Sequence, residues 1–150
     1  MNRFSVVALL MLGCTAQAQD DRRLLEAIGQ VESGMRRLAR GDGGAGLGCY
    51  QLHPKAWADG NAQLTREGRP TYARSQWRNQ TAQDMVAAAL LRALRGRLST
   101  KGIPSPTPEQ MALCWNLGFT GAEAIGFAVD RAPAVRADYA VRVGNLCKEK

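Results

Sequence analysis

The sequence predicts a single, mainly helical domain, all-α or α+β at most by a small hairpin around residues 43–52. Two observations predict this fold class. Apolar residues recur three and four positions apart in several segments, which is the spacing of one helical face, and no useful stretch alternates apolar and polar residues as a half-buried strand does. The chain of 150 residues is also long enough for one hydrophobic core and too short for two domains of ordinary size.

The first 18 residues have the pattern of a secretory signal peptide. Arg3 supplies the positive start, residues 6–12 form an apolar run, and Ala16-Gln17-Ala18 is a small-x-small cleavage signature. The run is too short to span a bilayer, so the mature domain would occupy residues 19–150, periplasmic or secreted, with no integral membrane segment after cleavage. An alternative is a lipoprotein, because Leu12-Gly13-Cys14 faintly resembles a lipoprotein box.

After the signal, the first helix is expected to start at a capping aspartate, Asp20 or Asp21. Its buried stripe would hold apolar residues three and four positions apart, namely Leu24, Ile28, Val31, Met35 and Leu38. The glycine-rich segment 41–48 then favours tight turns and close backbone approach. Pro54 suits the first turn of a short helix ending near Trp57, and residues 60–80 are polar and carry no clear element.

The second half of the chain is predicted to be helical. Thr81 begins a capping pattern for a helix that ends near Leu98, and Thr107, followed by Pro108 and Gln110, is a strong start for a helix that ends near Gly118. Two further helices are expected, one capped at Thr120 and one beginning at Pro133. The inner face of the last would consist of Val135, Tyr139, Val143 and Leu146.

Charge and cysteine usage limit the possible partners. Loss of Arg3 with residues 1–18 lowers the formal charge from +7 to +6, so an anionic partner is expected. Export and the lack of a Lys/Arg run interleaved with aromatic residues argue against nucleic acid. Cys49, Cys114 and Cys147 allow one disulfide and one free thiol, with all three pairings open. With one histidine and no C-x-x-C pair, the sequence predicts no metal and no cofactor.

Glu32 is the first candidate for a catalytic residue. The segment Val31-Glu32-Ser33-Gly34 places a carboxyl group beside the apolar stripe. Burial would raise the pKa of Glu32, and if Gly34 ends the helix, the negative end of the helix dipole would raise it further. A proton retained near neutral pH is what a general acid needs to cleave a glycosidic bond. The alternative is an ordinary solvent-facing glutamate, which the spacing alone favours.

Three ordered motifs resemble those of the lytic transglycosylase SLT-domain family within the lysozyme-like superfamily. They are Glu32-Ser33-Gly34, Gly48-Cys49-Tyr50-Gln51-Leu52 and Cys114-Trp115-Asn116-Leu117-Gly118, in a match over about residues 22–130. The resemblance implies a lysozyme-like fold that cuts peptidoglycan glycan strands, with Glu32 as the sole catalytic carboxylate. It implies that substrate is bound by Ser33, Tyr50, Gln51, Trp115 and Asn116. A secretion or conjugation apparatus is a further possible partner.

The sequence departs from the family at several positions. Trp115 stands where the family usually has tyrosine, so a phenol expected near the acid is missing from the motif, although an indole can still stack on a sugar. Leu117 replaces a small alanine. Cys49 and Cys114 occupy motif positions, which is compatible with a disulfide beside the cleft or with two buried apolar side chains.

The presence of a second carboxylate would decide the reaction outcome. Asp42 and Asp59 are the candidates, although a turn role for Asp42 is the more common one. Without a second carboxylate, Glu32 would act as acid and then as base, and the sugar's own hydroxyl would close an anhydro ring. The alternatives are a hydrolytic lysozyme and a non-catalytic wall-binding or assembly module. His53 is interpreted as a turn residue, because no acid is evidently placed to orient it.

Overall fold

The computed structural model describes the backbone of residues 3–149 and the side chains of residues 16–149. This part of the chain is mainly helical with one small antiparallel sheet, which confirms the coarse fold class. The helices are α1 Arg3–Ser33, α2 Pro54–Arg66, α3 Gln80–Thr100, α4 Pro108–Leu117, α5 Phe119–Ala124 and α6 Ala134–Lys148, with 3-10 turns η1 Asp42–Gly44, η2 Arg74–Gln76 and η3 Val129–Arg131. The strands are β1 Arg40–Gly41 and β2 Gly46–Leu47.

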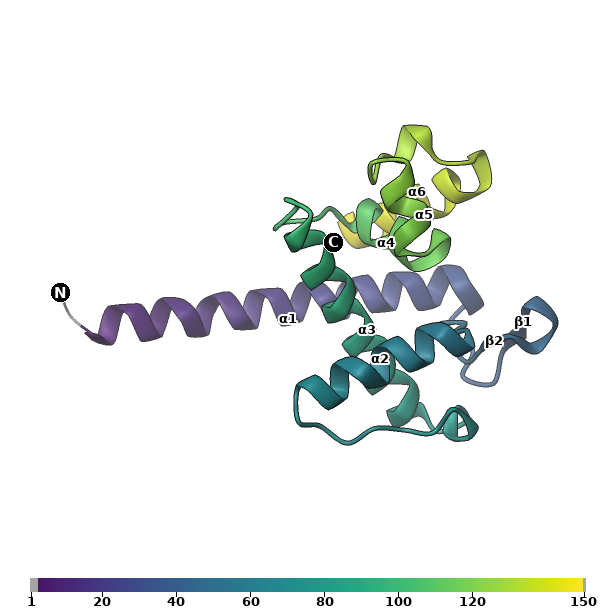
Figure 1. The fold of residues 1–150 in the computed structure, drawn as a ribbon, viewed down its shortest axis with the longest axis horizontal. Coiled ribbons are helices and arrows are strands. Elements are labelled where there is room, and N and C mark those ends of the chain that lie inside the picture. The colour runs from purple at the N-terminus through teal and green to yellow at the C-terminus, as the bar shows by residue number, and fades with distance from the viewer. Residues whose placement is uncertain (1–2, 150) are drawn as a thin grey trace.

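Helix α1 passes between two groups of elements (Figure 1). On one side α2 packs on α3, close to the β1–β2 hairpin; on the other α4 packs on α5 and α6. Helix α1 contacts both groups, through α3 and through α6. The C-terminal end of α1 therefore lies where the two groups meet.

Most of the expected signal segment 1–18 lies outside the described side chains. The backbone of α1 is continuous across the expected cleavage point after Ala18. None of the described helices has both the length and the apolar character needed to cross a bilayer.

Helix α1 ends at Ser33, before Met35 and Leu38, the last two residues of the buried stripe that the sequence predicted. Gly34 and Met35 both adopt positive φ, 61° and 59°, and the amide nitrogen of Met35 donates to the carbonyl oxygen of Gly29 at 3.1 Å. This glycine-based helix end turns the chain away from the core. Met35 and Leu38 are therefore 39% and 54% exposed, and their predicted place on the buried stripe was wrong.

One buried amide joins the loops beside the end of α1. The Gln83 side chain is fully buried; its Oε1 accepts from the Cys49 amide nitrogen at 2.8 Å. Its Nε2 donates to the carbonyl oxygens of Arg37 at 2.9 Å and Trp77 at 2.6 Å. Gly48 has φ of 77° and leaves the space that the Gln83 amide occupies. Gln83 thus fixes three loop segments against α3.

Helices α2 and α3 differ from their predicted bounds. Helix α2 continues to Arg66, because Trp57, Gly60 and Leu64 form a second buried stripe within the polar segment. Gly60 fits there since Val86 of α3 lies where a side chain would be. Helix α3 begins at Gln80 and is capped by Asn79, whose side chain accepts from the Ala82 nitrogen; the predicted cap at Thr81 was two residues late.

The last three helices agree with the sequence in part. Thr107 and Gln110 form the predicted capping box of α4, with hydrogen bonds of 3.2 and 3.0 Å. Helix α5 begins at Phe119, so Thr120 lies inside it and does not cap it. The buried face of α6 consists of Tyr139, Ala140, Val143 and Gly144. Val135 and Leu146, predicted on this face, are 77% and 36% exposed, because small residues suffice where α6 lies against α4.

The cysteines form no disulfide within the described part of the chain. Cys49, Cys114 and Cys147 are free thiols; the first two are buried and the third is half-buried. Cys49 and Cys114 therefore act as small apolar side chains, which is one of the two alternatives left open by the sequence.

Candidate active site

Glu32 lies in the last turn of α1, at the junction of the two helix groups. The side chain is half-buried, and its Oε1 accepts a hydrogen bond of 2.8 Å from the hydroxyl of Tyr139. Burial raises the pKa of Glu32 above 4.5, and the nearby Asp42 raises it further, while the Tyr139 hydrogen bond acts in the opposite direction. Glu32 is therefore a carboxyl group that keeps its proton more readily than an exposed one.

Tyr139 is the functional candidate that the motif comparison missed. Trp115 removes the phenol from the family motif, but α6 supplies another from 107 residues further along the chain than Glu32. Tyr139 is 8% exposed, and burial together with the neighbouring Glu32 raises its pKa well above its usual value. It therefore acts as a hydrogen-bond donor to Glu32, and the expected absence of a phenol beside the acid was wrong.

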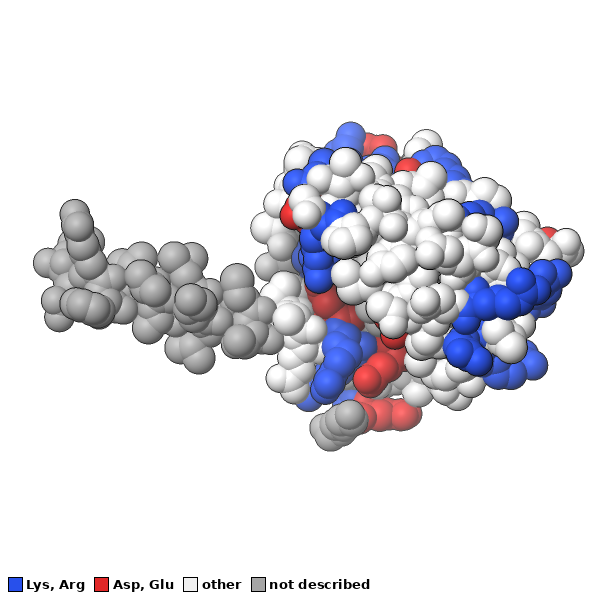
Figure 2. Space-filling view, turned by 90° about the horizontal axis from the view of Figure 1, so that it is seen from below, with Lys and Arg blue, Asp and Glu red and all other residues white. Residues whose placement is uncertain are grey.

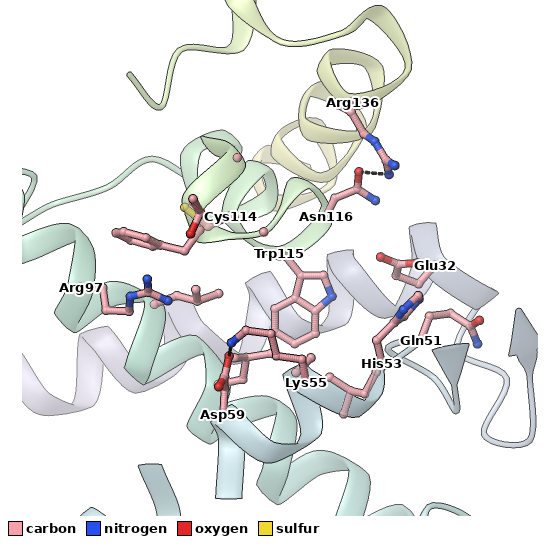
Figure 3. A pocket seen from close by; sticks show the side chains of 18 of the residues that line it. Glu32, Gln51, His53, Lys55, Asp59, Arg97, Cys114, Trp115, Asn116 and Arg136 are labelled. Carbon is pink, nitrogen blue, oxygen red and sulfur yellow. Dashed lines mark hydrogen bonds and ion pairs between the residues drawn. The ribbon is translucent and has the colours of Figure 1, made fainter. Parts of the chain in front are cut away.

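Glu32 opens into a cleft of about 490 Å³ between the two helix groups. One wall comes from the hairpin and α2, and the other from α4, α5 and α6 (Figure 3). The polar side chains that line it are Glu32, Asp42, Gln51, His53, Lys55, Asp59, Arg97, Trp115, Asn116, Thr120 and Arg136. Acidic, basic, amide and indole groups thus converge on one open groove, as in sites that bind polar polymers.

Two amide side chains that were predicted to bind substrate do line this cleft. Gln51 has a left-handed backbone with φ of 49°, and its Nε2 donates to the carbonyl oxygen of Gly48 at 2.8 Å. The Asn116 Oδ1 accepts from Arg136 at 2.6 Å, so its amide nitrogen is the atom that can donate into the cleft. Both side chains are held in place by bonds within the protein.

Trp115 is the indole that faces the cleft. Figure 3 shows it projecting from α4 toward the middle of the pocket. Trp57 and Trp77 are only 2% and 6% exposed, so these two tryptophans belong to the core. An exposed indole face in a cleft can stack on an apolar sugar face.

Ser33 and Tyr50 lie outside the cleft, although both were predicted to bind substrate. The Ser33 hydroxyl donates to the carbonyl oxygen of Cys49 at 2.7 Å and joins the end of α1 to the following loop. Tyr50 is 5% exposed, and its hydroxyl donates to Asp84 at 2.8 Å on the opposite face of α1. Both side chains hold the 48–52 loop in position with their polar atoms bonded inside the protein, and the structure does not bring them together with the residues that line the cleft.

Comparison with known proteins found no relative of this chain. No protein-family model, curated protein or solved structure matches this chain. The chemistry of the cleft is therefore interpreted from its own residues.

The two candidate second carboxylates differ in their partners. The Asp42 Oδ2 lies 2.7 Å from the His53 Nε2 at the edge of the cleft, and both side chains are largely exposed. Asp59 is bound by Lys55 at 2.7 Å. Asp42 thus orients His53, which corrects the view that no acid is placed to do so. Both groups lie close enough to Glu32 to influence its pKa, Asp42 raising it and His53 lowering it.

A larger groove of about 960 Å³ lies on the other face, between α1 and α3. Its acidic groups are already paired: Asp21 with Arg95, Glu26 with Arg22, and Asp84 with the Tyr50 hydroxyl and Gln80. Among the described side chains, no three His, Cys, Asp or Glu groups lie together as metal ligands would. Glu32 in the smaller cleft is the carboxyl group with a raised pKa, so the cleft is the better candidate for catalysis.

Proposed function

We propose that this protein is a peptidoglycan lytic transglycosylase with a lysozyme-like domain, and that Glu32 is its catalytic acid and base. The observation that carries the proposal is the half-buried Glu32, with its raised pKa and its bond to Tyr139, at the wall of an open cleft. Gln51, Trp115 and Asn116 line the same cleft, where amides can bind the N-acetyl and hydroxyl groups of an amino-sugar polymer.

In this mechanism Glu32 first donates its proton to the glycosidic oxygen. The bond between that oxygen and the anomeric carbon breaks, and positive charge develops on the sugar ring. Glu32, now a carboxylate, then removes a proton from a hydroxyl of the same sugar. That oxygen bonds to the anomeric carbon and closes an anhydro ring, which leaves Glu32 protonated for the next cycle.

The surroundings of Glu32 suit both halves of this cycle. Burial favours the neutral acid that begins the reaction, and the Tyr139 hydroxyl stabilises the carboxylate that follows. The two effects oppose each other, and the net result is a raised pKa of Glu32. The basic net charge, +6 without Arg3 and the rest of residues 1–18, would hold the domain on the acidic wall polymer.

Hydrolysis is the second candidate outcome, and the Asp42–His53 pair favours it. A histidine oriented by a carboxylate at the edge of the cleft can activate a water molecule, which would then attack the anomeric carbon in place of the sugar hydroxyl. The signal-like N-terminus supports a periplasmic or secreted location, in wall turnover or beside a secretion or conjugation apparatus.

The test is digestion of purified peptidoglycan, with released fragments identified by mass spectrometry. Wild type and Glu32→Gln are compared with Glu26→Gln, the same substitution at an exposed position of the same helix. We expect anhydro ends from wild type and Glu26→Gln and none from Glu32→Gln. Reducing ends, one water heavier, would indicate a lysozyme instead. Wall binding without release by wild type would leave a non-catalytic binding module.

A further inference from the structure

Five arginines form a compact surface at one end of the molecule. We call this the arginine surface: Arg36, Arg37, Arg40, Arg74 and Arg78. Figure 2 shows Lys and Arg side chains gathered on the right, at the end where Figure 1 places the β1–β2 hairpin. The five residues come from two segments, 36–40 and 74–78, that are far apart in the sequence.

The two segments are held side by side by bonds from the core. Gln83 donates to the backbone of Arg37 and of Trp77, and thereby fixes one segment against the other. The guanidinium groups of Arg40 and Arg78 lie over the Trp77 ring, 5.1 and 4.8 Å from its centroid. The Trp77 indole of the second segment thus contacts one arginine from each segment, and the fold fixes how these charges are arranged.

The arginine surface is not neutralised within the protein. Neither segment contains Asp or Glu, and none of the ion pairs among the described residues involves these five arginines. Arg36 and Arg74 donate instead to the backbone carbonyl oxygens of Ser33 and Ala45. The concentrated positive charge is therefore available to an external anion.

One large apolar side chain, that of Leu38, is exposed in the first segment. Leu38 is 54% exposed next to Arg37, whereas the sulfur of Met35 folds back against Gly29 of α1. Leu38 is thus flanked in sequence by arginines on both sides. An exposed apolar side chain beside unpaired cations combines apolar insertion with attraction to anionic lipids, the two contributions that bind proteins at a membrane surface.

We propose that the arginine surface binds an anionic phospholipid bilayer, with guanidinium groups on lipid phosphates and Leu38 in the interfacial layer. Guanidinium groups bind phosphate in a planar, bidentate manner. A nucleic acid fits less well, because Trp77 is 6% exposed beneath its arginines and cannot stack on bases. A carbohydrate polymer would leave the exposed Leu38 side chain without a partner.

The hairpin connects this surface to the cleft. Arg40 of β1 belongs to the arginine surface, and Asp42, two residues later, lines the cleft. Membrane binding would therefore hold the cleft at a set distance from the lipid surface. The proposal does not depend on what the cleft cleaves.

The test is co-sedimentation of the full chain with vesicles of phosphatidylglycerol and phosphatidylcholine. Arg37, Arg40 and Arg78 are replaced together by Gln; their side chains are exposed and make no described hydrogen bond. Each arginine removed should weaken the affinity for anionic vesicles about fivefold, so the triple variant should bind them roughly 100-fold more weakly. Leu38→Ser should reduce it by about tenfold at unchanged charge. The matched control replaces three exposed arginines elsewhere, Arg66, Arg131 and Arg142, and should bind as wild type does.

The controls separate this surface from other sources of binding. Circular dichroism and thermal unfolding establish that both triple variants fold. If the apolar N-terminus attached the chain to vesicles, all variants would bind equally. They would also bind vesicles of phosphatidylcholine alone as well as they bind anionic vesicles, and that result would overturn the proposal. Loss of binding to DNA or to peptidoglycan in the Arg37/Arg40/Arg78 variant, with vesicle binding unchanged, would also overturn it. Glu32→Gln should bind vesicles as wild type does, so a failed cleavage assay leaves this test intact.

Discussion

Replacement of Tyr139 by Phe tests whether the phenol controls Glu32. The substitution keeps the ring that fills a site only 8% exposed and removes the hydroxyl that donates to Glu32 at 2.8 Å. A hydrogen bond to a charged group contributes about 2 kcal/mol. For a domain of this size, each kcal/mol corresponds to about 3 °C, so Tm at pH 7 should fall by about 6 °C.

The same substitution should change the pH dependence in a defined direction. Tyr139 lowers the pKa of Glu32, so its loss raises that pKa further above the unfolded value of 4.5. Ionisation then costs more in the folded state, and the loss of stability should be larger at pH 7 than at pH 4, where the carboxyl is mostly protonated in both states. The basic limb of the pH–activity profile should move to higher pH.

Differential scanning fluorimetry and peptidoglycan clearing across pH 4–9 measure both effects. Tyr72→Phe is the matched control, because the hydroxyl of the half-buried Tyr72 makes no described hydrogen bond. Equal Tm losses at pH 4 and pH 7, with an unmoved basic limb, would refute the assigned role of Tyr139.

Four further substitutions or treatments test other parts of the structure. Glu32→Gln should gain stability relative to wild type as pH rises above 4.5, because burial makes the folded carboxylate costly; a pH-independent difference in urea unfolding would contradict this. Asp42→Asn should lower the share of reducing ends relative to anhydro ends, and an unchanged ratio by mass spectrometry would remove the His53 pair from the reaction. Gln83→Ala should cost about 3 kcal/mol in urea unfolding, since it leaves the buried Cys49 amide, the buried Trp77 carbonyl and the half-buried Arg37 carbonyl unpaired; a loss under about 1 kcal/mol would show that they find other partners. Burial raises the pKa of Cys114 to about 12, so iodoacetamide at pH 8 should label it only after denaturation, as peptide mass spectrometry would show.

Features set by local chemistry could be predicted from the sequence. The capping box of α4 depends on Thr107 and Gln110, three residues apart, and needs no tertiary contact. The end of α1 was also signalled locally, by Gly34. The apolar spacing continued through Met35 and Leu38, however, and a periodic pattern cannot show that a left-handed residue has turned the chain outward.

Features that depend on contacts between distant segments could not be predicted in this way. Tyr139 was placed on the buried face of α6, but nothing in the sequence indicated that its hydroxyl meets Glu32, 107 residues earlier. Ser33 and Tyr50 stand in motif-like positions, yet bonds to Cys49 and Asp84 turn their hydroxyls away from the cleft. A motif specifies residue types, whereas packing decides which atoms remain free.

The two ends of the 33–49 segment explain why one short loop serves both proposed sites. The Ser33 hydroxyl bonds to the Cys49 carbonyl, and the Cys49 amide bonds to Gln83, so both ends of the loop are anchored to the core. Between these anchors the chain leaves α1, reverses direction in the β1–β2 hairpin and returns to the end of α1. Its side chains therefore face two directions. Asp42 faces the cleft beside Glu32, and Arg37 and Arg40 face away from it. A change in the Gln83 anchor should therefore disturb cleavage and vesicle binding together, whereas the arginine substitutions should disturb binding alone.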